Sequence, residues 1–248
     1  MTQMTPVEQI KEGLGFERVV HLQGSTYREN GTIVVIPTRG MVHTKVINAW
    51  DNLIAPMNQK RAKIYASGDE VGIAYNKLIK AILDDPNLSQ WKYILTLEDD
   101  NLPPPDAHIR LLESIQGIGD HGPFDAVSGI YFTKGPVNMP QAYGCPEEFK
   151  NTGKLDFRPR HVTEAIARGQ IMPVCGIAMG CALWRLDLFR ELEPPWFVTV
   201  ADIIPDKGIV GFTQDLYFCE RAVRAGKRFA VDMRVKVGHL DVETGVVY

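Results

Sequence analysis

The sequence has few of the features that mark disulfide-stapled, zinc-binding or membrane-spanning proteins. Its 248 residues include only four cysteines, Cys145, Cys175, Cys181 and Cys219. None belongs to a C-x-x-C pair or to a Cys/His zinc spacing, and their neighbours are apolar residues or glycine. We therefore expect buried thiols in a reducing compartment. No stretch approaches the ~20 apolar residues of a membrane span.

Strong charge of one sign is also lacking. The formal net charge is -3, which leaves no electrostatic footprint for non-specific nucleic-acid binding, although it averages over faces and permits a local basic patch. The opening stretch, MTQMTPVEQIKEG, is polar and acidic, unlike a signal or transit peptide. We therefore expect a cytoplasmic protein. With 45% hydrophobic residues, the chain can bury the core of one large α/β domain without staples.

Strand and helix signals alternate through the first half of the chain. Short apolar, β-branched runs are typical of strands buried on both faces, and the segments between them carry apolar residues at helical spacing. This order predicts a doubly wound parallel sheet whose carboxyl edge binds ligands. The predicted strands are 32–36, 62–66, 91–97 and 124–132, and the predicted helices are 42–54, 72–83 and 106–115.

The second half is less regular. Its Gly, Pro and polar residues between 133 and 160 predict a long loop or flap over the site. We expect a second irregular stretch at 194–209. The remaining predicted elements are strand-like segments at 171–176 and 178–184, a short helix at 186–192, a helix at 213–225 with Gly226 as its C-cap, and short strands at 228–231 and 235–237.

An acidic cluster, Glu98-Asp99-Asp100-Asn101, follows directly after the strand 91–97. Adjacent carboxylates repel one another and raise their own pKa values. A divalent cation removes that cost, since Mg²⁺ and Mn²⁺ prefer carboxylate oxygens. Asp and Asn also favour turns, so the cluster alone leaves a purely structural role open.

Two further residues have both a structural and a chemical interpretation. Asp215 lies at the start of the helix 213–225, where Thr213 as N-cap and an acid in the first turn both suit the helix dipole. The alternative is a carboxylate in the cleft, kept ionised by that dipole and available as a base. His239 follows the last strand, where a lone histidine is usually a surface or capping residue.

The stretch 176–182 is rich in small residues but matches neither a Walker A motif nor a dinucleotide fingerprint. This lowers the case for an ATPase or a dehydrogenase. Taken together, the motifs resemble the GT-A glycosyltransferases, in particular the family 2-like enzymes of bacteria and bacteriophages. The resemblance spans 32–239 and is carried by six short segments: 34–39, 71–77, 95–100, 180–185, 213–219 and 237–239.

The resemblance implies a GT-A (Rossmann-like) α/β fold, with a mainly parallel central sheet flanked by helices and a smaller irregular acceptor-side region. It implies one domain over 1–248. That domain would comprise an N-terminal extension (1–30), a nucleotide-sugar-binding half (31–132), and an acceptor-binding and catalytic half (133–248).

The resemblance also implies site residues. Asp100, Glu98 and His239 would hold Mn²⁺ or Mg²⁺, and Asp215 would be the catalytic base. Two positions depart from the family pattern. The first acid of its Asp-x-Asp motif is Glu98 here, so the register could instead be Asp99 with Asn101. Before the catalytic position, Gln214 stands where Glu is common. The implied donor-binding residues are Pro37, Thr38, Arg39, Asn76, Glu98, Asp99 and Gly180.

The implied activity is metal-dependent transfer of a sugar from a UDP- or GDP-linked donor to a hydroxyl of a glycan, a small molecule or a hydroxylated DNA base. One alternative is a sugar-phosphate nucleotidylyltransferase, although Pro37-Thr38-Arg39-Gly40 replaces the glycine-rich phosphate loop of those enzymes. Another is a nucleotide- or carbohydrate-binding module without turnover. The choice between inverting and retaining chemistry stays open, as does the oligomeric state.

Overall fold

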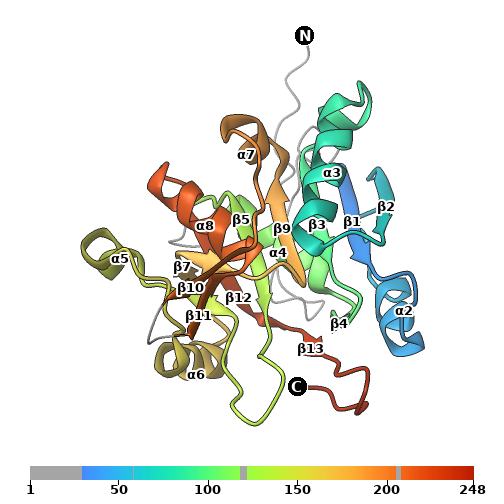
Figure 1. Cartoon of the computed structure of the whole chain (residues 1–248). Coiled ribbons are helices and arrows are strands. Elements are labelled where there is room, and N and C mark those ends of the chain that lie inside the picture. Colours follow the sequence, from blue (N-terminus) through green and yellow to red (C-terminus); the bar gives the residue numbers. More distant parts are fainter. Residues whose placement is uncertain (1–29, 58, 118–121, 205–207) are drawn as a thin grey trace, which may run out of the picture.

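Seven strands form the central sheet in the order β2-β1-β3-β9-β5-β12-β7 (Figure 1). The computed structural model describes residues 30–57, 59–117, 122–204 and 208–248, so the predicted N-terminal extension lies outside the described residues up to position 29. β1 pairs in parallel with β2 and β3, and β5 pairs in parallel with β12. The strands are β1 (Thr32–Thr38), β2 (Arg61–Ser67), β3 (Tyr93–Leu97), β5 (Ala126–Ile130), β7 (Ile171–Val174), β9 (Cys181–Arg185) and β12 (Phe229–Lys236).

The sheet is mainly parallel, as predicted, but two of its strands run the other way. β9 lies between β3 and β5 and is antiparallel to both, and β7 is antiparallel to β12. The direction of β9 has a consequence for the site. Because Leu97 pairs with Cys181, the start of β9 lies beside the end of β3, and Gly180 therefore reaches the carboxyl edge of the sheet.

Helices cover both faces of the sheet (Figure 1). Successive side chains of β1 alternate between the faces: Ile33 and Val35 enter one apolar core, whereas Val34 and Ile36 enter the other. The first core contains residues of α3 (Val71–Asp84), α6 (Pro159–Arg168), α7 (Leu186–Glu191) and α8 (Gln214–Arg224), and the second contains residues of α2 (Thr44–Asp51) and α4 (Ala107–Gln116).

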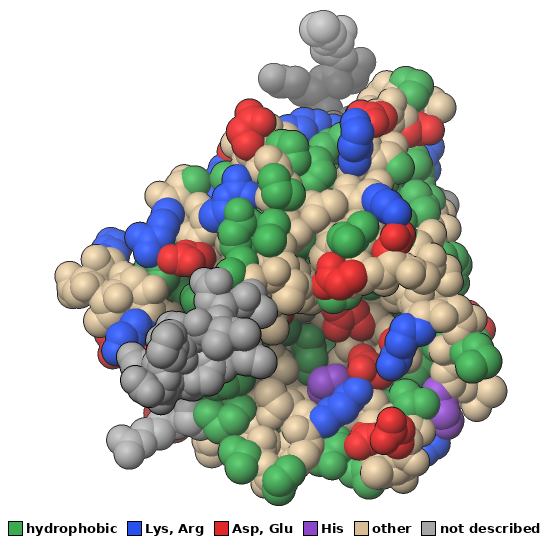
Figure 2. Space-filling model, viewed as in Figure 1, with side chains coloured by type: hydrophobic (Ala, Val, Ile, Leu, Met, Phe, Trp, Pro, Cys, Tyr) green, Lys and Arg blue, Asp and Glu red, His purple; other side chains and the backbone are tan. Residues whose placement is uncertain are grey.

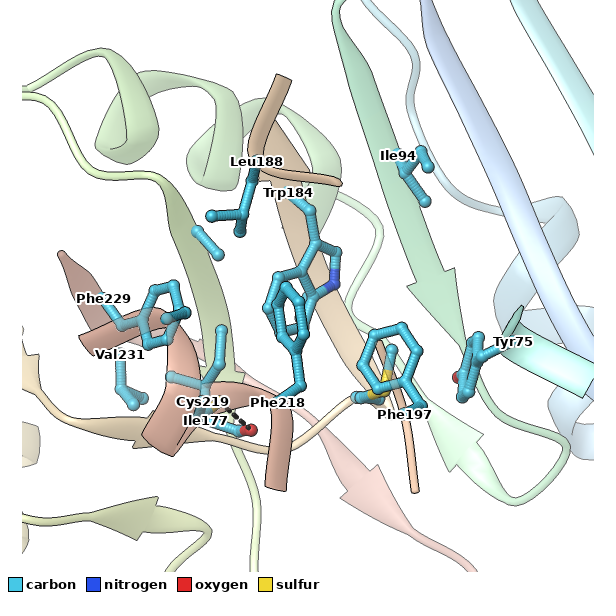
Figure 3. Packing of buried hydrophobic residues seen from close by; sticks show 14 of the residues in the cluster. Tyr75, Ile94, Ile177, Trp184, Leu188, Phe197, Phe218, Cys219, Phe229 and Val231 are labelled. Atoms are coloured by element: carbon cyan, nitrogen blue, oxygen red, sulfur yellow. Dashed lines mark hydrogen bonds between the residues drawn. The ribbon is translucent and has the colours of Figure 1, made fainter. Parts of the chain in front are cut away.

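Trp184 is the centre of the first core (Figure 3). Its ring lies 5.7 Å from that of Phe218 on α8 and 6.5 Å from that of Phe197. Its indole N–H donates a 3.1 Å hydrogen bond to Thr96 Oγ1, so no buried polar atom of the ring is left unpaired. Phe197 also packs at 5.5 Å against Tyr75 of α3. This aromatic cluster joins α3 and α8 to the sheet.

The predicted loop at 133–160 is wrong in part, because helices and a short strand occupy much of it. Some of its prolines and glycines mark helix ends instead: α5 and α6 carry Pro in the first turn, and α5 ends at the left-handed Gly153. Beyond this stretch, α6 ends at the left-handed Gly169. The elements concerned are β6 (Ala142–Tyr143), α5 (Pro146–Thr152) and α6, and β6 pairs with β8 (Gly176–Ile177).

Two other predictions change in the second half. The stretch 194–209 is not wholly irregular, because β10 (Val200–Ile204) pairs antiparallel with β11 (Gly208–Phe212). The strands predicted at 228–231 and 235–237 form one strand, β12, with an irregularity after Asp232. The buried Asp232 interrupts the apolar pattern without ending the strand, since Ser114 and Arg234 donate hydrogen bonds to its carboxylate.

The remaining boundaries follow the sequence closely. Gly226, at a φ of 83°, ends α8 as predicted, and the amide of Lys227 donates to Ala222 O at 3.0 Å. A 3₁₀ turn covers Leu88–Gln90. Beside the acidic cluster, the two-residue strand β4 (Asn101–Leu102) pairs with β13 (Gly238–His239).

Candidate functional site

A cavity of about 390 Å³ opens at the carboxyl ends of β1 and β3. This is the edge at which ligands bind in parallel α/β sheets. Figure 2 shows red acidic side chains around a hollow on this face, with blue cationic side chains and a purple histidine nearby. The residues that line the cavity are Pro37, Thr38, Arg39, Asp69, Val71, Glu98, Asp99, Asp100 and Gln214.

A tight turn after β3 separates the three consecutive carboxylates. The amide of Asn101 donates to Glu98 O at 3.1 Å, and the amide of Glu98 donates to Gly180 O at 3.3 Å. The turn sends each side chain to a different neighbour, which limits the repulsion expected from the sequence.

Asp99 holds the loop that follows β1. One of its oxygens accepts a hydrogen bond from the Arg39 amide at 3.1 Å and one from Thr38 Oγ1 at 3.3 Å. The other accepts from Arg39 Nη2 at 3.0 Å. The Arg39 side chain is nevertheless 74% exposed, so its remaining N–H groups face the solvent at the mouth of the cavity.

Asp100 faces a histidine and a lysine. Its Oδ2 atom lies 3.6 Å from His239 Nε2 and 2.5 Å from Lys134 Nζ. Hydrogen bonds and charge from both neighbours lower the pKa of Asp100, against the opposing effect of burial. The structure therefore brings together two residues predicted to bind a metal and adds a cation that the sequence analysis did not identify.

A backbone carbonyl fixes the orientation of His239. Its Nδ1 atom lies 2.7 Å from the carbonyl oxygen of Phe132, which can only accept, so Nδ1 must carry a proton. In the neutral ring, Nε2 then presents a lone pair toward Asp100. Two acceptors that face each other require a cation or a proton between them, and a histidine fixed through its other nitrogen is typical of metal sites.

Backbone pairing fixes the place of His239. Its amide donates to Tyr248 O and its carbonyl accepts from the Tyr248 amide, each at 3.0 Å. The neighbouring Leu240 amide donates to Asp100 O at 2.7 Å. The imidazole packs edge-on against Tyr131, with ring centroids 5.3 Å apart. The pairing of His239 with Tyr248 and the bond from Leu240 to Asp100 together hold the imidazole beside the Asp100 side chain.

Glu98 points away from Asp99 and Asp100. Tyr75 OH donates to its carboxylate at 3.4 Å. Loss of hydration, together with the negative charges of Asp100 and Asp215, raises the pKa of Glu98 to about 8. This environment disfavours the ionised form of Glu98, which is the form that binds a metal ion.

Asp215 is buried at the start of α8. The Leu216 amide donates to its Oδ1 atom at 2.9 Å. We expected the helix dipole to keep the pKa of this carboxyl low, and that expectation is wrong. Burial raises the pKa of Asp215 by more than the surrounding hydrogen bonds lower it, because lost hydration outweighs the dipole of one helix end.

Gly180 makes the close approach between β9 and the acidic turn possible. Its amide donates to Tyr131 OH at 2.9 Å. A Cβ atom at this position would lie 2.3 Å from Asn101 Oδ1. The Asn101 side chain is fully buried, and neither of its polar atoms has a hydrogen-bond partner. Gly180 thus approaches a buried side chain whose two polar atoms are both without a hydrogen-bond partner.

Asn76 lies apart from the residues that line the cavity. Its amide nitrogen donates to Gly72 O at 2.8 Å and to Phe197 O at 2.6 Å, and its oxygen accepts from the Trp196 amide at 2.9 Å. These bonds join α3 to the segment before β10. A donor-binding role for Asn76 stays a prediction.

The predicted three-residue metal set is not assembled. Among the described residues, no three His, Cys, Asp or Glu side chains form a group that could hold a metal ion. Asp100 and His239 do come together, whereas Glu98 turns toward Tyr75. A carboxylate together with substrate phosphates is a ligand set that Mg²⁺ and Mn²⁺ accept.

Sequence reasoning missed Lys134, Tyr131 and Tyr75. The two tyrosines are part of apolar stretches that predict core, and only the tertiary structure turns their hydroxyls toward Gly180 and Glu98. Lys134 belongs to the segment predicted to cover the site. The prediction that this segment covers the site was the one available indication, and it did not distinguish Lys134 from its neighbours.

Comparisons with known proteins bear on the fold alone. No family model matches the chain, and no curated protein matches it. The crystal structure of A197 from STIV is similar, with a TM-score of 0.55 and 15% sequence identity over 86% of this chain and 87% of that one. This similarity supports the GT-A-like α/β fold predicted above. In the described part of the chain, none of the helices has the length and apolar character needed to cross a bilayer.

The raised pKa of Glu98 predicts a pH-dependent effect of Glu98→Gln. A carboxyl with a folded pKa of about 8 contributes stability that is present below its unfolded pKa and lost as the pH rises to 8. The free energy of unfolding of Glu98→Gln, relative to that of the wild type, should therefore rise by about 1.4 kcal/mol per pH unit across that window. Urea unfolding at pH 5.5 and 7.5 measures this difference. The exposed Glu164→Gln should retain the wild-type pH profile, and a flat difference for Glu98→Gln would contradict the prediction.

The close approach of Gly180 and Asn101 predicts strong coupling between substitutions. Gly180→Ala should cost about 1–3 kcal/mol of unfolding free energy, since the new methyl group overlaps the Asn101 side chain. Asn101→Ala removes the overlapping atoms, so the double variant should be more stable than the two single effects predict, by about 0.5–3 kcal/mol. Chemical denaturation of all four proteins completes the cycle. If the two single effects on the unfolding free energy simply add, the backbone has shifted to relieve the overlap and the predicted coupling is absent.

Proposed function

We propose that this protein is a metal-dependent glycosyltransferase that uses a nucleoside-diphosphate sugar as its donor. The observation that carries the proposal is the pairing of Asp100 with His239, whose Nδ1 is occupied by a carbonyl oxygen. The pair lies beside a cavity whose other wall is the Thr38–Arg39 loop. A carboxylate and an imidazole lone pair directed at one point suit a divalent cation.

Each wall of the cavity has a role in donor binding. Asp100 and His239 would hold Mn²⁺ or Mg²⁺, which acts as a Lewis acid on diphosphate oxygens when bound. Asp99 fixes the loop after β1 through Thr38 and Arg39. The exposed part of the Arg39 guanidinium is then available to a phosphate or to the face of a base.

Asp215 would act on the acceptor. Gln214, the residue before Asp215, lines the same cavity as the acidic turn. The raised pKa of Asp215 brings it nearer to the working pH, as a general base requires. In an inverting transfer, the acceptor oxygen bonds to the anomeric carbon as its proton passes to Asp215. The bond from that carbon to the diphosphate breaks, and the diphosphate leaves with the electron pair.

The products distinguish this proposal from its alternatives. A glycosyltransferase releases a nucleoside diphosphate, and in the absence of acceptor it transfers the sugar slowly to water. A nucleotidylyltransferase would instead exchange pyrophosphate with a nucleoside triphosphate, and a binding module would release no product. Incubation with UDP- and GDP-linked sugars and Mn²⁺, followed by chromatography of the nucleotides, identifies the reaction.

Metal dependence is the first prediction of the proposal. EDTA should abolish donor hydrolysis, and Mn²⁺ or Mg²⁺ should restore it. Asp100→Ala should remove the response to Mn²⁺, whereas Asp99→Ala should keep that response and weaken donor binding, because Asp99 contacts the Thr38–Arg39 loop. Thermal shift with donor at about 100 times its Kd reads out binding as ~2.7 kcal/mol of stabilisation. Full hydrolysis in EDTA would exclude the metal role.

The base role of Asp215 gives the second prediction. Asp215→Asn should lower the transfer rate by about 10²–10⁴-fold, since an amide cannot accept the proton. Its melting temperature should stay at or above that of the wild type, because burial raises the pKa of the carboxyl and the neutral amide avoids a buried charge. Asp187→Asn makes the same change in the first turn of α7, at an exposed carboxyl outside the cavity, and should retain transfer within a few-fold. A similar rate for Asp215→Asn would exclude the base.

A further inference from the structure

Lys134 contacts the Asp100 oxygen that faces His239. Its ammonium lies 2.5 Å from Asp100 Oδ2, the same oxygen that faces His239 Nε2 at 3.6 Å. The lysine side chain is 31% exposed and that of Asp100 is 18% exposed, so the pair is only partly open to solvent. In the structure, Lys134 supplies the positive charge that Asp100 requires.

The loop that carries Lys134 is closed at its base. The Thr133 amide donates to Met139 O at 2.8 Å, and Thr133 Oγ1 donates to Val137 O at 3.0 Å. The residue before this loop, Phe132, supplies the carbonyl oxygen that orients His239. The ammonium stands on a flexible four-carbon stem, so it can leave Asp100 by side-chain rotation while the loop base and His239 stay in place.

We propose that Lys134 couples the binding of the divalent cation to the binding of the donor diphosphate. The inference rests on the proposed function. A cation that bridges His239 Nε2 and the nearest Asp100 oxygen binds the oxygen that Lys134 now contacts, so it competes with the ammonium. The displaced ammonium remains beside the cation, where the two positive charges repel each other. An anionic diphosphate relieves that repulsion, because it contacts the cation and can accept hydrogen bonds from Lys134.

Cation and nucleotide should therefore bind cooperatively. Without nucleotide, Mn²⁺ competes with the Lys134 ammonium for Asp100 and binds weakly. With a nucleoside diphosphate bound, Lys134 donates to the diphosphate and no longer competes for Asp100. By linkage, the cation strengthens nucleotide binding by the same factor by which the nucleotide strengthens cation binding. In this arrangement Lys134 is a positioning residue for the diphosphate.

The test measures Mn²⁺ affinity by titration calorimetry, without nucleotide and with saturating UDP or GDP, for the wild type and Lys134→Gln. Without nucleotide, Lys134→Gln should bind Mn²⁺ at least tenfold more tightly than the wild type, because the competing ammonium is gone. The ratio of the Mn²⁺ dissociation constants without and with nucleotide should fall at least fivefold in the variant. Melting temperatures verify that both proteins are folded.

Lys150→Gln is the matched control, because it removes the same charge from an exposed position on α5 and should leave both Mn²⁺ constants unchanged. Equal Mn²⁺ affinity in wild type and Lys134→Gln, with nucleotide-dependent Mn²⁺ binding in both, overturns the coupling and leaves the proposed glycosyltransferase intact. Absence of Mn²⁺ binding by every protein, with or without nucleotide, overturns the coupling and the metal role together.

Discussion

Repulsion among the three successive carboxylates of Glu98, Asp99 and Asp100 is the constraint on which the site depends. The turn after β3 limits this repulsion because each acid contacts a different partner: Tyr75 for Glu98, the Thr38–Arg39 loop for Asp99, and His239 with Lys134 for Asp100. These partners come from four separate parts of the chain. The acidic turn therefore organises the carboxyl edge of the sheet even before any ligand is bound.

Burial divides the acids of the site into two chemical classes. The cationic neighbours of Asp100 lower its pKa, whereas loss of hydration raises the pKa values of Glu98 and Asp215. Glu98 also faces other negative charges, which raise its pKa further. Groups whose environments move their pKa values apart are a feature of catalytic sites. An ionised Asp100 suits cation binding, and a more basic Asp215 suits proton transfer. The proposed roles therefore follow the electrostatics of each position.

The aromatic core helps to position these acids. Trp184 contacts Phe218 on α8 and Phe197, and Phe197 contacts Tyr75 on α3. Through these rings the start of α8, with Asp215, is held against the same sheet that carries Glu98. The pairing of His239 with Tyr248 and the bond from Leu240 to Asp100 fix the opposite side of the site. Both sides are thus positioned by packing and backbone bonds.

The sequence by itself determined the α/β class, the strands and helices of the first half, and the meeting of the Thr38–Arg39 loop with Glu98–Asp100 at one sheet edge. Those features depend on local periodicity, which the first half of the chain shows clearly, and on the regular geometry of parallel crossovers. The helices within 133–160 were missed because proline and glycine mark helix ends as well as loops.

Only the tertiary structure decided the direction of β9, the placement of Lys134 on Asp100, and the raised pKa values of Glu98 and Asp215. Each depends on contacts between residues far apart in the chain: β9 on its pairing with β3 and β5, Lys134 on a loop that reaches across to the acidic turn, and the pKa values on how completely the fold removes water. The helix dipole at Asp215 could be anticipated from the sequence. The burial that outweighs it could not, because hydration is a property of the whole packed core.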